Sequence, residues 1–202
     1  MGLWLAPSPL VLASGSAVRR GLLEAAGIPV EARPASLDER AIEAGAPSEE
    51  PGAVAALLAR AKALHVAAQM PGRLVVGADQ TLALGRRRFD KPKDRAAARA
   101  QLRALAGRTH ELHAAVAVAR GPQVLYEHVG VARLTMRALT DAFLDRYLDA
   151  VGPAVVASVG AYQVEGPGIH LFERIEGDHF TVLGLPLLPL LAYLRAEGSL
   201  AA

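Results

Sequence analysis

Residues 74–80 read Leu-Val-Val-Gly-Ala-Asp-Gln, a continuous apolar run that meets an acidic residue. Such a run is typical of a buried strand, so we expect a strand over Leu74–Ala78 that ends at Asp79. An acidic residue at the end of a buried strand faces the crevice in which α/β proteins bind ligands. Gly77 lets another part of the backbone approach closely. Asp79 is therefore a candidate to hold a cation or activate water, although a helix or turn cap is a slightly commoner role for an aspartate at the end of a strand.

The N-terminal side of this stretch predicts a strand, a loop and a helix. Leu10–Ala13 is a short apolar run, and Ser14-Gly15-Ser16 supplies the turn and the N-cap of the helix that follows. A helix N-terminus offers N–H groups and the positive end of its dipole to a phosphate, and Arg19 adds a guanidinium. A capped helix with solvent-facing arginines explains these residues equally well.

A second strand is expected over Ile28–Ala32, followed by an acidic turn at Asp38-Glu39. A helix is expected to begin near Pro51, whose fixed φ suits a first helical turn. Its apolar stripe is expected to consist of Val54, Leu57, Leu58, Ala61 and Leu64. Lys62 lies beside that stripe.

The rest of the chain predicts further helices and strands. We expect a surface loop at Arg86–Arg88, and then the basic segment Lys91-Pro92-Lys93 before a helix capped by Asp94. The two lysines could reach phosphate oxygens, but a solvated loop is the commoner role of such a charge run. The later elements expected are long antiparallel strands over 109–119 and 123–136, a helix capped by Thr140 that ends at Gly152, short strands around 169–172, a loop near 177 and a helix over 186–196. With no repeat or linker, we expect one mixed α/β domain over 1–202.

The composition excludes several classes of protein. The chain of 202 residues is 52% hydrophobic, which is enough for a sizeable core, and its 22 Lys+Arg against 20 Asp+Glu leave a net charge of only +2. Nucleic-acid binding is disfavoured by this near-neutral charge and by an aromatic content of 4%. The absence of cysteine excludes disulfides and thiol nucleophiles and is consistent with the cytoplasm. The apolar N-terminus lacks a basic region and no run is long enough to span a bilayer, so we expect a soluble protein without a membrane partner.

The histidines do not indicate a metal site. His110 and His113 are three residues apart on a predicted strand and therefore point to opposite faces. They cannot easily share one ion, and we interpret them as structural. Ser14 and Ser16 show no nucleophile elbow and no base partner.

Five segments, taken in order, resemble the pattern of the Maf family: Leu12-Ala13-Ser14-Gly15-Ser16, Val76-Gly77-Ala78-Asp79, Lys91-Pro92-Lys93-Asp94, Gly107-Arg108-Thr109-His110 and Val182-Leu183-Gly184-Leu185-Pro186. The resemblance covers nearly the whole chain. It implies a fold similar to that of inosine triphosphate pyrophosphatases, a mixed central sheet with flanking helices in two lobes around a cleft. It also implies a homodimeric, divalent-metal-dependent (Mg or Mn) pyrophosphatase that cleaves nucleoside triphosphates to the monophosphate and pyrophosphate.

The same resemblance implies roles for individual residues. Asp79 would be the general base, a metal ligand or both, and Glu39 would assist the metal. Lys62 and Lys91 would neutralise phosphate charge. The first phosphate cradle would consist of Ser14, Ser16 and Arg19. One departure is Val18, which stands where the family has a basic or aromatic-basic residue and cannot donate to a phosphate.

Two positions bear on the base of the substrate. Gln80 follows the aspartate and Glu165 precedes a late glycine, and with the segment Leu171–Arg174 they resemble the 7-methyl-GTP branch of the family more than the dTTP/UTP branch. The Glu165 carboxylate could accept hydrogen bonds from the N1–H and N2–H₂ edge of guanine and favour a cationic methylated ring. The alternatives are a dTTP/UTP pyrophosphatase and a non-catalytic nucleotide-binding regulator of septum formation and cell division.

Overall fold

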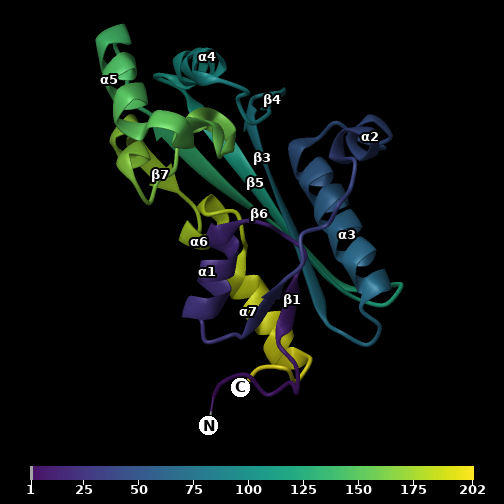
Figure 1. Cartoon of the computed structure of the whole chain (residues 1–202). Coiled ribbons are helices and arrows are strands. Elements are labelled where there is room, and N and C mark those ends of the chain that lie inside the picture. The colour runs from purple at the N-terminus through teal and green to yellow at the C-terminus, as the bar shows by residue number, and fades with distance from the viewer. Residues whose placement is uncertain (1) are drawn as a thin grey trace. The chain divides into compact units, whose positions relative to one another are not determined.

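The computed structural model describes residues 2–202, which form two compact units (Figure 1). The first unit contains residues 2–80, 113–130 and 178–202, and the second contains residues 81–112 and 131–177. Three long strands, β3 (Val75–Leu84), β5 (Thr109–Arg120) and β6 (Gln123–Met136), contribute residues to both units. The expectation of a single domain over the whole chain stays a prediction.

The first unit combines two parallel strand pairings with five helices. Besides its parts of the long strands it contains β1 (Leu10–Leu12), α1 (Ala17–Ala25), β2 (Val30–Ala32), α2 (Glu39–Ala44), α3 (Pro51–Gln69), α6 (His179–Val182) and α7 (Leu187–Ala196). β1 pairs in parallel with both β2 and β3. The chain ends meet in this unit, where Trp4 forms an antiparallel bridge with Leu200.

The second unit contains the remaining helices and strands. These are β4 (Arg87–Phe89), α4 (Arg95–Leu105), α5 (Asp141–Val151), the 3₁₀ turns Gly152–Val156, Val159–Ala161 and Pro167–Leu171, and β7 (Phe172–Glu176). All strands belong to one sheet in the order β2-β1-β3-β5-β6-β7, with β4 paired to β3. The parallel pairs of β1 and the antiparallel pairs β3–β4 and β6–β7 make the sheet mixed, which confirms the expected fold class.

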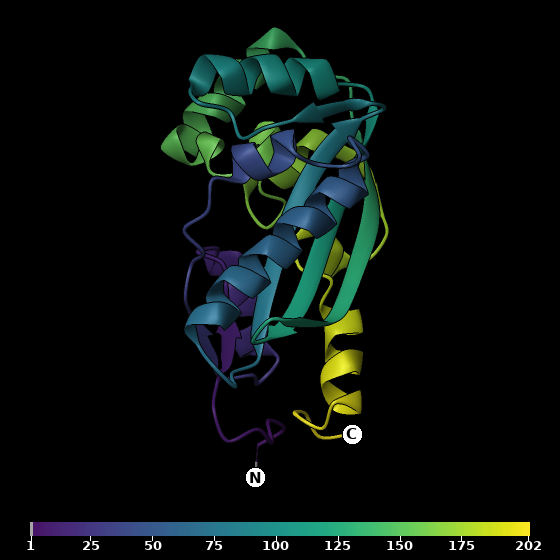
Figure 2. The same cartoon turned by 90° about the vertical axis from the view of Figure 1, so that its right-hand side faces the viewer.

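Two apolar clusters lie on opposite faces of the first unit's part of the sheet. Leu10, Leu12 and Val76 pack with α1 and α7, whereas Val11, Ala13 and Val75 pack with α3. This is the alternation that a period of two residues imposes on extended strands. Figures 1 and 2 show α3 along one face of the sheet and α1 with α7 along the other.

The strand that contains the acidic motif is longer than predicted. It does not end at Asp79 but continues to Leu84, where it pairs with β4 in a hairpin. Asp79 and Gln80 therefore lie in the middle of β3, with side chains on opposite faces. The expected surface loop at Arg86–Arg88 is likewise wrong, because Arg87 and Arg88 belong to β4 and only the turn at Gly85, with its φ of 59°, separates the two strands.

The helix α3 lies against β3 at a very short distance, and Gly77 makes this possible. A Cβ atom at Gly77 would lie 2.1 Å from the carbonyl oxygen of Ala59 and 2.6 Å from the nitrogen of Ala63. The predicted close approach of another backbone is thus confirmed. The predicted stripe of α3 is partly wrong, since the buried face consists of Gly52, Val54, Ala55, Leu58, Ala59, Lys62, Ala63, Val66 and Ala67. Alanines face the sheet here, so the positions of the large apolar residues do not identify the buried face of α3. Lys62 lies within that buried face.

Two further predictions need correction. The segment Asp38-Glu39 is not a simple acidic turn: the Asp38 carboxylate accepts a hydrogen bond from the Ala41 nitrogen and caps α2. The short strands expected around residues 169–172 are a 3₁₀ turn over Pro167–Leu171 followed by β7. Pro167 fixes φ at the start of that turn and favours the helical conformation.

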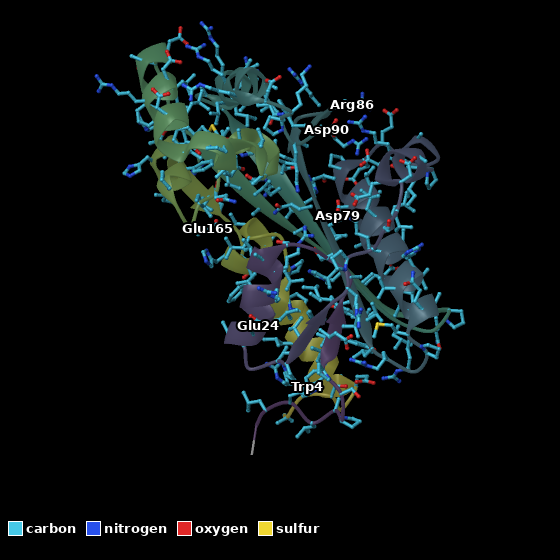
Figure 3. The ribbon with its side chains drawn as sticks, in the orientation of Figure 1. Trp4, Glu24, Asp79, Arg86, Asp90 and Glu165 are labelled. Atoms are coloured by element: carbon cyan, nitrogen blue, oxygen red, sulfur yellow. The ribbon has the colours of Figure 1, made fainter. Side chains whose placement is uncertain are left out.

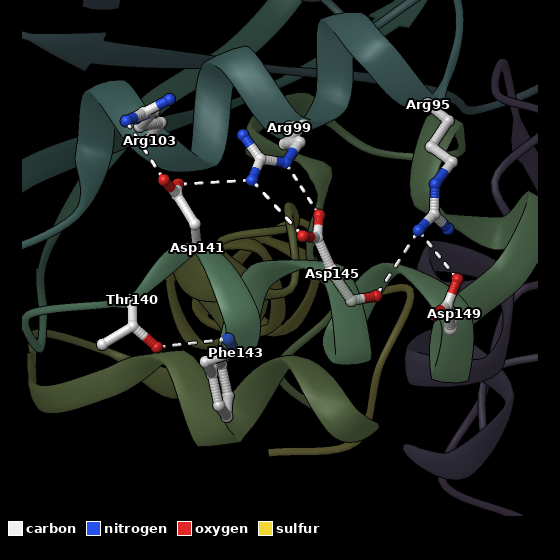
Figure 4. Close-up of polar contacts among 8 residues, drawn as sticks. All are labelled: Arg95, Arg99, Arg103, Thr140, Asp141, Phe143, Asp145 and Asp149. Carbon is white, nitrogen blue, oxygen red and sulfur yellow. Dashed lines mark hydrogen bonds and ion pairs between the residues drawn. The ribbon is translucent and has the colours of Figure 1, made fainter.

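In the second unit, α4 and α5 are joined by a ladder of ion pairs (Figure 4). Arg95 contacts Asp149 at 2.7 Å, Arg99 contacts Asp145 at 2.8 Å and Asp141 at 3.2 Å, and Arg103 contacts Asp141 at 3.2 Å. The arginines are spaced by four residues on one helix and the aspartates by four on the other, so each set lies on a single face. The caps predicted for both helices, Asp94 and Thr140, are confirmed.

Substituting Gly77 tests the close packing of α3 on β3. Gly77→Ala should lower the free energy of unfolding by about 3 kcal/mol or more, because the new methyl group meets backbone atoms that cannot move independently. The matched control is Gly21→Ala on α1, where a Cβ meets nothing within 4 Å. Urea denaturation measures both. A Gly77→Ala protein as stable as the control would contradict this account of the packing.

The buried His110 predicts a pH dependence of stability. Its Nε2 contacts the Tyr162 hydroxyl at 2.7 Å, and burial lowers the pKa of the imidazole from 6.5 to about 4. As the pH falls, His110 therefore binds a proton in the unfolded chain at a higher pH than in the folded chain. The contribution of neutral His110 to the free energy of unfolding is fully present above about pH 6.5 and is lost as the pH falls through about 4. The total loss in the free energy of unfolding is roughly 3 kcal/mol. Urea midpoints between pH 7 and pH 4.5 should fall less steeply for His110→Gln, while the exposed His170→Gln should follow the wild type.

Candidate active site

The centre of the candidate site is a buried ion pair between β3 and α3. The Lys62 Nζ donates to Asp79 Oδ1 at 2.6 Å, and each residue is only 8% exposed. Figure 3 shows Asp79 beside α3. Burial raises the pKa of the Asp79 carboxyl above its ordinary value, while the Lys62 ammonium and the Arg19 guanidinium oppose this shift. Asp79 is therefore a better proton acceptor than a solvated aspartate.

Glu39, the first residue of α2, brings a second carboxylate to the same lysine. Its Oε1 lies 3.0 Å from Lys62 Nζ, and unlike Asp79 it is exposed. The negative charge of Glu39 also contributes to the raised pKa of Asp79. The helix cap at Asp38 fixes the start of α2 and hence the position of Glu39. The sequence predictions thus named all three members of this cluster but did not predict the helix that positions Glu39.

The serines and Arg19 connect the start of α1 to β3. Ser16 caps α1 by accepting from the Arg19 nitrogen at 3.3 Å. The Arg19 guanidinium donates from Nη1 to Ser14 Oγ at 3.2 Å and to the Ala78 carbonyl at 2.9 Å, and from Nε to the Gly184 carbonyl at 2.8 Å. The Arg19 guanidinium is thus held by three segments of the chain. The proposed phosphate cradle stays a prediction, but its members do lie together.

Gln80 points to the opposite face of the sheet from Asp79 and binds the backbone of α6. Its Nε2 donates to the carbonyls of Thr181 at 3.0 Å and Val182 at 3.1 Å. Thr181 is held in turn by Asp178 and packs so closely on Gly130 that any Cβ there would lie 2.6 Å from its hydroxyl. The carbonyls of residues 181, 182 and 184 were not predicted from the sequence, because backbone acceptors leave no signal in residue types.

The two remaining candidates, Lys91 and Glu165, belong to the second unit. Lys91 is exposed in the segment between β4 and α4. Glu165 is exposed on a tightly built segment, in which Tyr162 contacts His110 and accepts from Ser158 at 2.6 Å through its carbonyl. Gly168 packs against this segment so closely that a Cβ would lie 2.3 Å from the Gln163 carbonyl oxygen. The loop that carries Glu165 is therefore well defined.

The residues that could hold a metal ion are few. Within residues 2–202 no group of three or more His, Cys, Asp and Glu residues is arranged for a metal. The interpretation of His110 as structural agrees with its packing against Tyr162 and Phe172. Asp79 and Glu39, which approach one cation together, are the carboxylate donors that the cluster offers.

A buried carboxylate–lysine pair beside a capped helix N-terminus on a mixed α/β sheet is suited to phosphate chemistry. The family model described as Maf-like protein matches residues 9–197, so the chain belongs to the Maf family. A protein of Rhodopseudomonas palustris named nucleoside triphosphate pyrophosphatase is 60% identical over 100% of both chains, and one of Bradyrhizobium diazoefficiens with the same name is 59% identical over 100% of both.

Two other comparisons concern the branch and the fold. A Rhizobium etli protein named 7-methyl-GTP pyrophosphatase is 55% identical over 95% of this chain and 97% of its own. The solved structure of a HAM1 protein from Coxiella burnetii is similar with a TM-score of 0.40 and 18% identity, covering 63% of this chain and 72% of that one. The likeness to the Coxiella structure is too low to support an argument about this site.

The contact of Gln80 with α6 predicts a local change in dynamics. Gln80→Glu removes the two donated hydrogen bonds and places a carboxylate opposite two carbonyl oxygens. Amide hydrogen exchange in residues 178–186 should become faster by roughly tenfold or more, since each lost hydrogen bond contributes about 1 kcal/mol. The control is Gln69→Glu, a change of the same type at an exposed position. Unchanged exchange in residues 178–186 would show that Gln80 does not hold this segment.

Proposed function

We propose that this protein hydrolyses nucleoside triphosphates to nucleoside monophosphate and pyrophosphate. The observation that carries the proposal is Asp79, a buried carboxylate of raised pKa held by Lys62 in a member of the Maf family. Support also comes from the full-length relatives at 59% and 60% identity that are named nucleoside triphosphate pyrophosphatase. The chain would accordingly be a hydrolase of nucleotide metabolism.

In the proposed reaction, water attacks the α-phosphorus. A new bond forms between the water oxygen and the α-phosphorus, and the bond from the α-phosphorus to the oxygen that bridges it to the β-phosphorus breaks. Pyrophosphate leaves with the electron pair of that bond. The Asp79 carboxylate would take the proton from the attacking water, because burial has raised its pKa and so its affinity for a proton.

The positive side chains would balance the charge of the triphosphate. Lys62 and Arg19 surround Asp79 in the first unit, and Lys91 is proposed, by resemblance to the family, to add a third charge. Neutralising phosphate charge in a site of low polarity is the main contribution a protein makes to phosphoryl chemistry. Ser14 and Ser16 would complete the phosphate cradle at the start of α1.

A divalent cation, Mg²⁺ or Mn²⁺, is proposed as the cofactor. The donor set fits such an ion, because Mg²⁺ sites that bind nucleotides commonly use one or two carboxylates together with phosphate oxygens and water. Asp79 and Glu39, whose oxygens already surround one cationic nitrogen, would hold it. When bound, the ion would neutralise phosphate charge and lower the pKa of a bound water.

The preference for 7-methyl-GTP is proposed from Glu165 and from the Rhizobium etli relative named for that substrate. Glu165 is exposed and therefore free to accept hydrogen bonds from a purine edge. Gln80 is a weaker candidate for base recognition, because its amide donors already bind the carbonyls of Thr181 and Val182.

Three other expectations stay predictions: a homodimer, the absence of a nucleic-acid partner, and a cytoplasmic location. Within residues 2–202, none of the helices has the length and apolar character needed to cross a membrane.

Replacing Asp79 tests the reaction centre. Asp79→Asn should lower the rate of pyrophosphate release by roughly 10²-fold or more, because an amide cannot accept the proton of the attacking water. The substitution leaves the side-chain volume nearly unchanged. Circular dichroism must show an intact fold. The control is Glu24→Gln, which makes the same chemical change at a half-exposed surface ion pair. Release of single phosphate instead of pyrophosphate by the wild type would contradict the proposed cleavage, whatever the variants do.

A substrate series tests the proposed base preference. With Mg²⁺ or Mn²⁺, the wild type should hydrolyse 7-methyl-GTP with a higher kcat/KM than GTP, UTP or dTTP. Glu165→Gln should lower the ratio for 7-methyl-GTP over UTP by roughly tenfold, since hydrogen bonds to charged groups contribute about 1.5–3 kcal/mol. Glu176→Gln, at another exposed glutamate of the same unit and outside the branch-specific segment, is the control. A wild-type preference for UTP or dTTP would defeat the assignment.

A further inference from the structure

Lys62 has an unusual position for a residue whose only role is to bind phosphate. Its ammonium lies 2.6 Å from Asp79 Oδ1 and 3.0 Å from Glu39 Oε1, the two carboxylates that the proposed metal would use. Lys62 is 8% exposed and lies on the buried face of α3, which Gly77 holds close to β3. The lysine is therefore built into the fold between the two candidate metal ligands.

The charges of this cluster are balanced without a metal ion. In their ionised forms Asp79 and Glu39 supply two negative charges and Lys62 and Arg19 two positive charges, so the formal charges of the four side chains sum to zero. An ammonium and a divalent cation would compete for the same carboxylate oxygens and repel each other. The cluster thus lacks the excess negative charge that attracts a free divalent ion.

We propose that Lys62 fills the cation position between Asp79 and Glu39 until the nucleotide arrives, so that the metal ion enters together with the triphosphate and not ahead of it. The proposal rests on the metal-dependent function proposed above. A triphosphate supplies new anionic partners for the Lys62 ammonium, which is a flexible point charge with three donors. Transfer of the ammonium to a phosphate would leave the two carboxylates available to the metal.

This role of Lys62 differs measurably from simple phosphate binding. A lysine that binds phosphate at a distance from the two carboxylates has little influence on the affinity for metal when no nucleotide is present. A lysine that occupies the cation position lowers that affinity, and its removal raises it. The comparison needs no turnover, so it can succeed or fail independently of the proposed pyrophosphatase activity.

The test measures Mn²⁺ binding to the nucleotide-free protein by electron paramagnetic resonance at pH 7.5. Lys62→Gln should bind Mn²⁺ roughly tenfold more tightly than the wild type or better, because one competing positive charge has been removed. Lys62→Arg keeps a cation and should bind as weakly as the wild type. The matched control is Arg60→Gln on the same helix, which removes an equal charge from an exposed pair with Glu127 and should change the affinity less than twofold.

Two further measurements assign the effect to this cluster. The gain in Mn²⁺ affinity should disappear in the double variant Lys62→Gln with Asp79→Asn, because one of the two carboxylate ligands has been removed. A triphosphate with a methylene group between its α- and β-phosphorus atoms should raise the Mn²⁺ affinity of the wild type more than that of Lys62→Gln. If Lys62→Gln is less stable, Mn²⁺ should raise its Tm more than that of the wild type. Equal nucleotide-free affinities for Lys62→Gln and the wild type, or an equal gain in Arg60→Gln, would overturn the proposal.

Discussion

The contact between Gly77 and the backbone of α3 determines the geometry of the whole cluster. The space that a methyl group would occupy at Gly77 is filled by the Ala59 carbonyl and the Ala63 nitrogen. Asp79 lies two residues along β3 on the same face, and Lys62 precedes Ala63 on α3, so this contact brings the carboxylate and the ammonium together at 2.6 Å. A larger residue at position 77 would separate the helix from the strand, and with it the two charges.

The buried pair of Lys62 and Asp79 has an energetic cost. Removing a carboxylate and an ammonium from water costs several kcal/mol each, and their attraction offsets this only when the geometry is good. Arg19 and Glu39 add nearby charges of opposite sign: Arg19 lowers the pKa of Asp79 and Glu39 raises it. The net effect of burial is still a raised pKa for Asp79, which suits a proton acceptor better than a structural ion pair.

Much of the fold could be predicted from the sequence, because most elements follow from local patterns. The helix caps at Ser16, Asp94 and Thr140 and the long strands β5 and β6 were predicted correctly. The end of β3 was predicted wrongly, because two polar residues such as Asp79 and Gln80 normally mark the end of a buried strand. Within β3 they are accommodated by their hydrogen-bond partners. Those partners, Lys62 and the carbonyls near residue 181, are distant in the sequence.

The candidate site, like the fold, could be predicted only in part from the sequence. Its residue types could be identified from the motifs of the family, but not the direction in which each side chain points. The buried face of α3 is rich in alanine, so apolar periodicity placed Lys62 beside the stripe when it lies within the buried face. Gln80 donates its hydrogen bonds to backbone carbonyls of α6, and the residue types of a sequence do not show where backbone carbonyls lie.

The most direct test of this account is a crystal structure with Mn²⁺ and a triphosphate that contains a methylene group between its α- and β-phosphorus atoms. We expect the anomalous signal of Mn²⁺ at the carboxylates of Asp79 and Glu39, the α-phosphate beside Asp79, and the Lys62 ammonium on a phosphate oxygen. A metal ion and an α-phosphate bound away from Asp79, with the Lys62–Asp79 pair unchanged, would contradict the account.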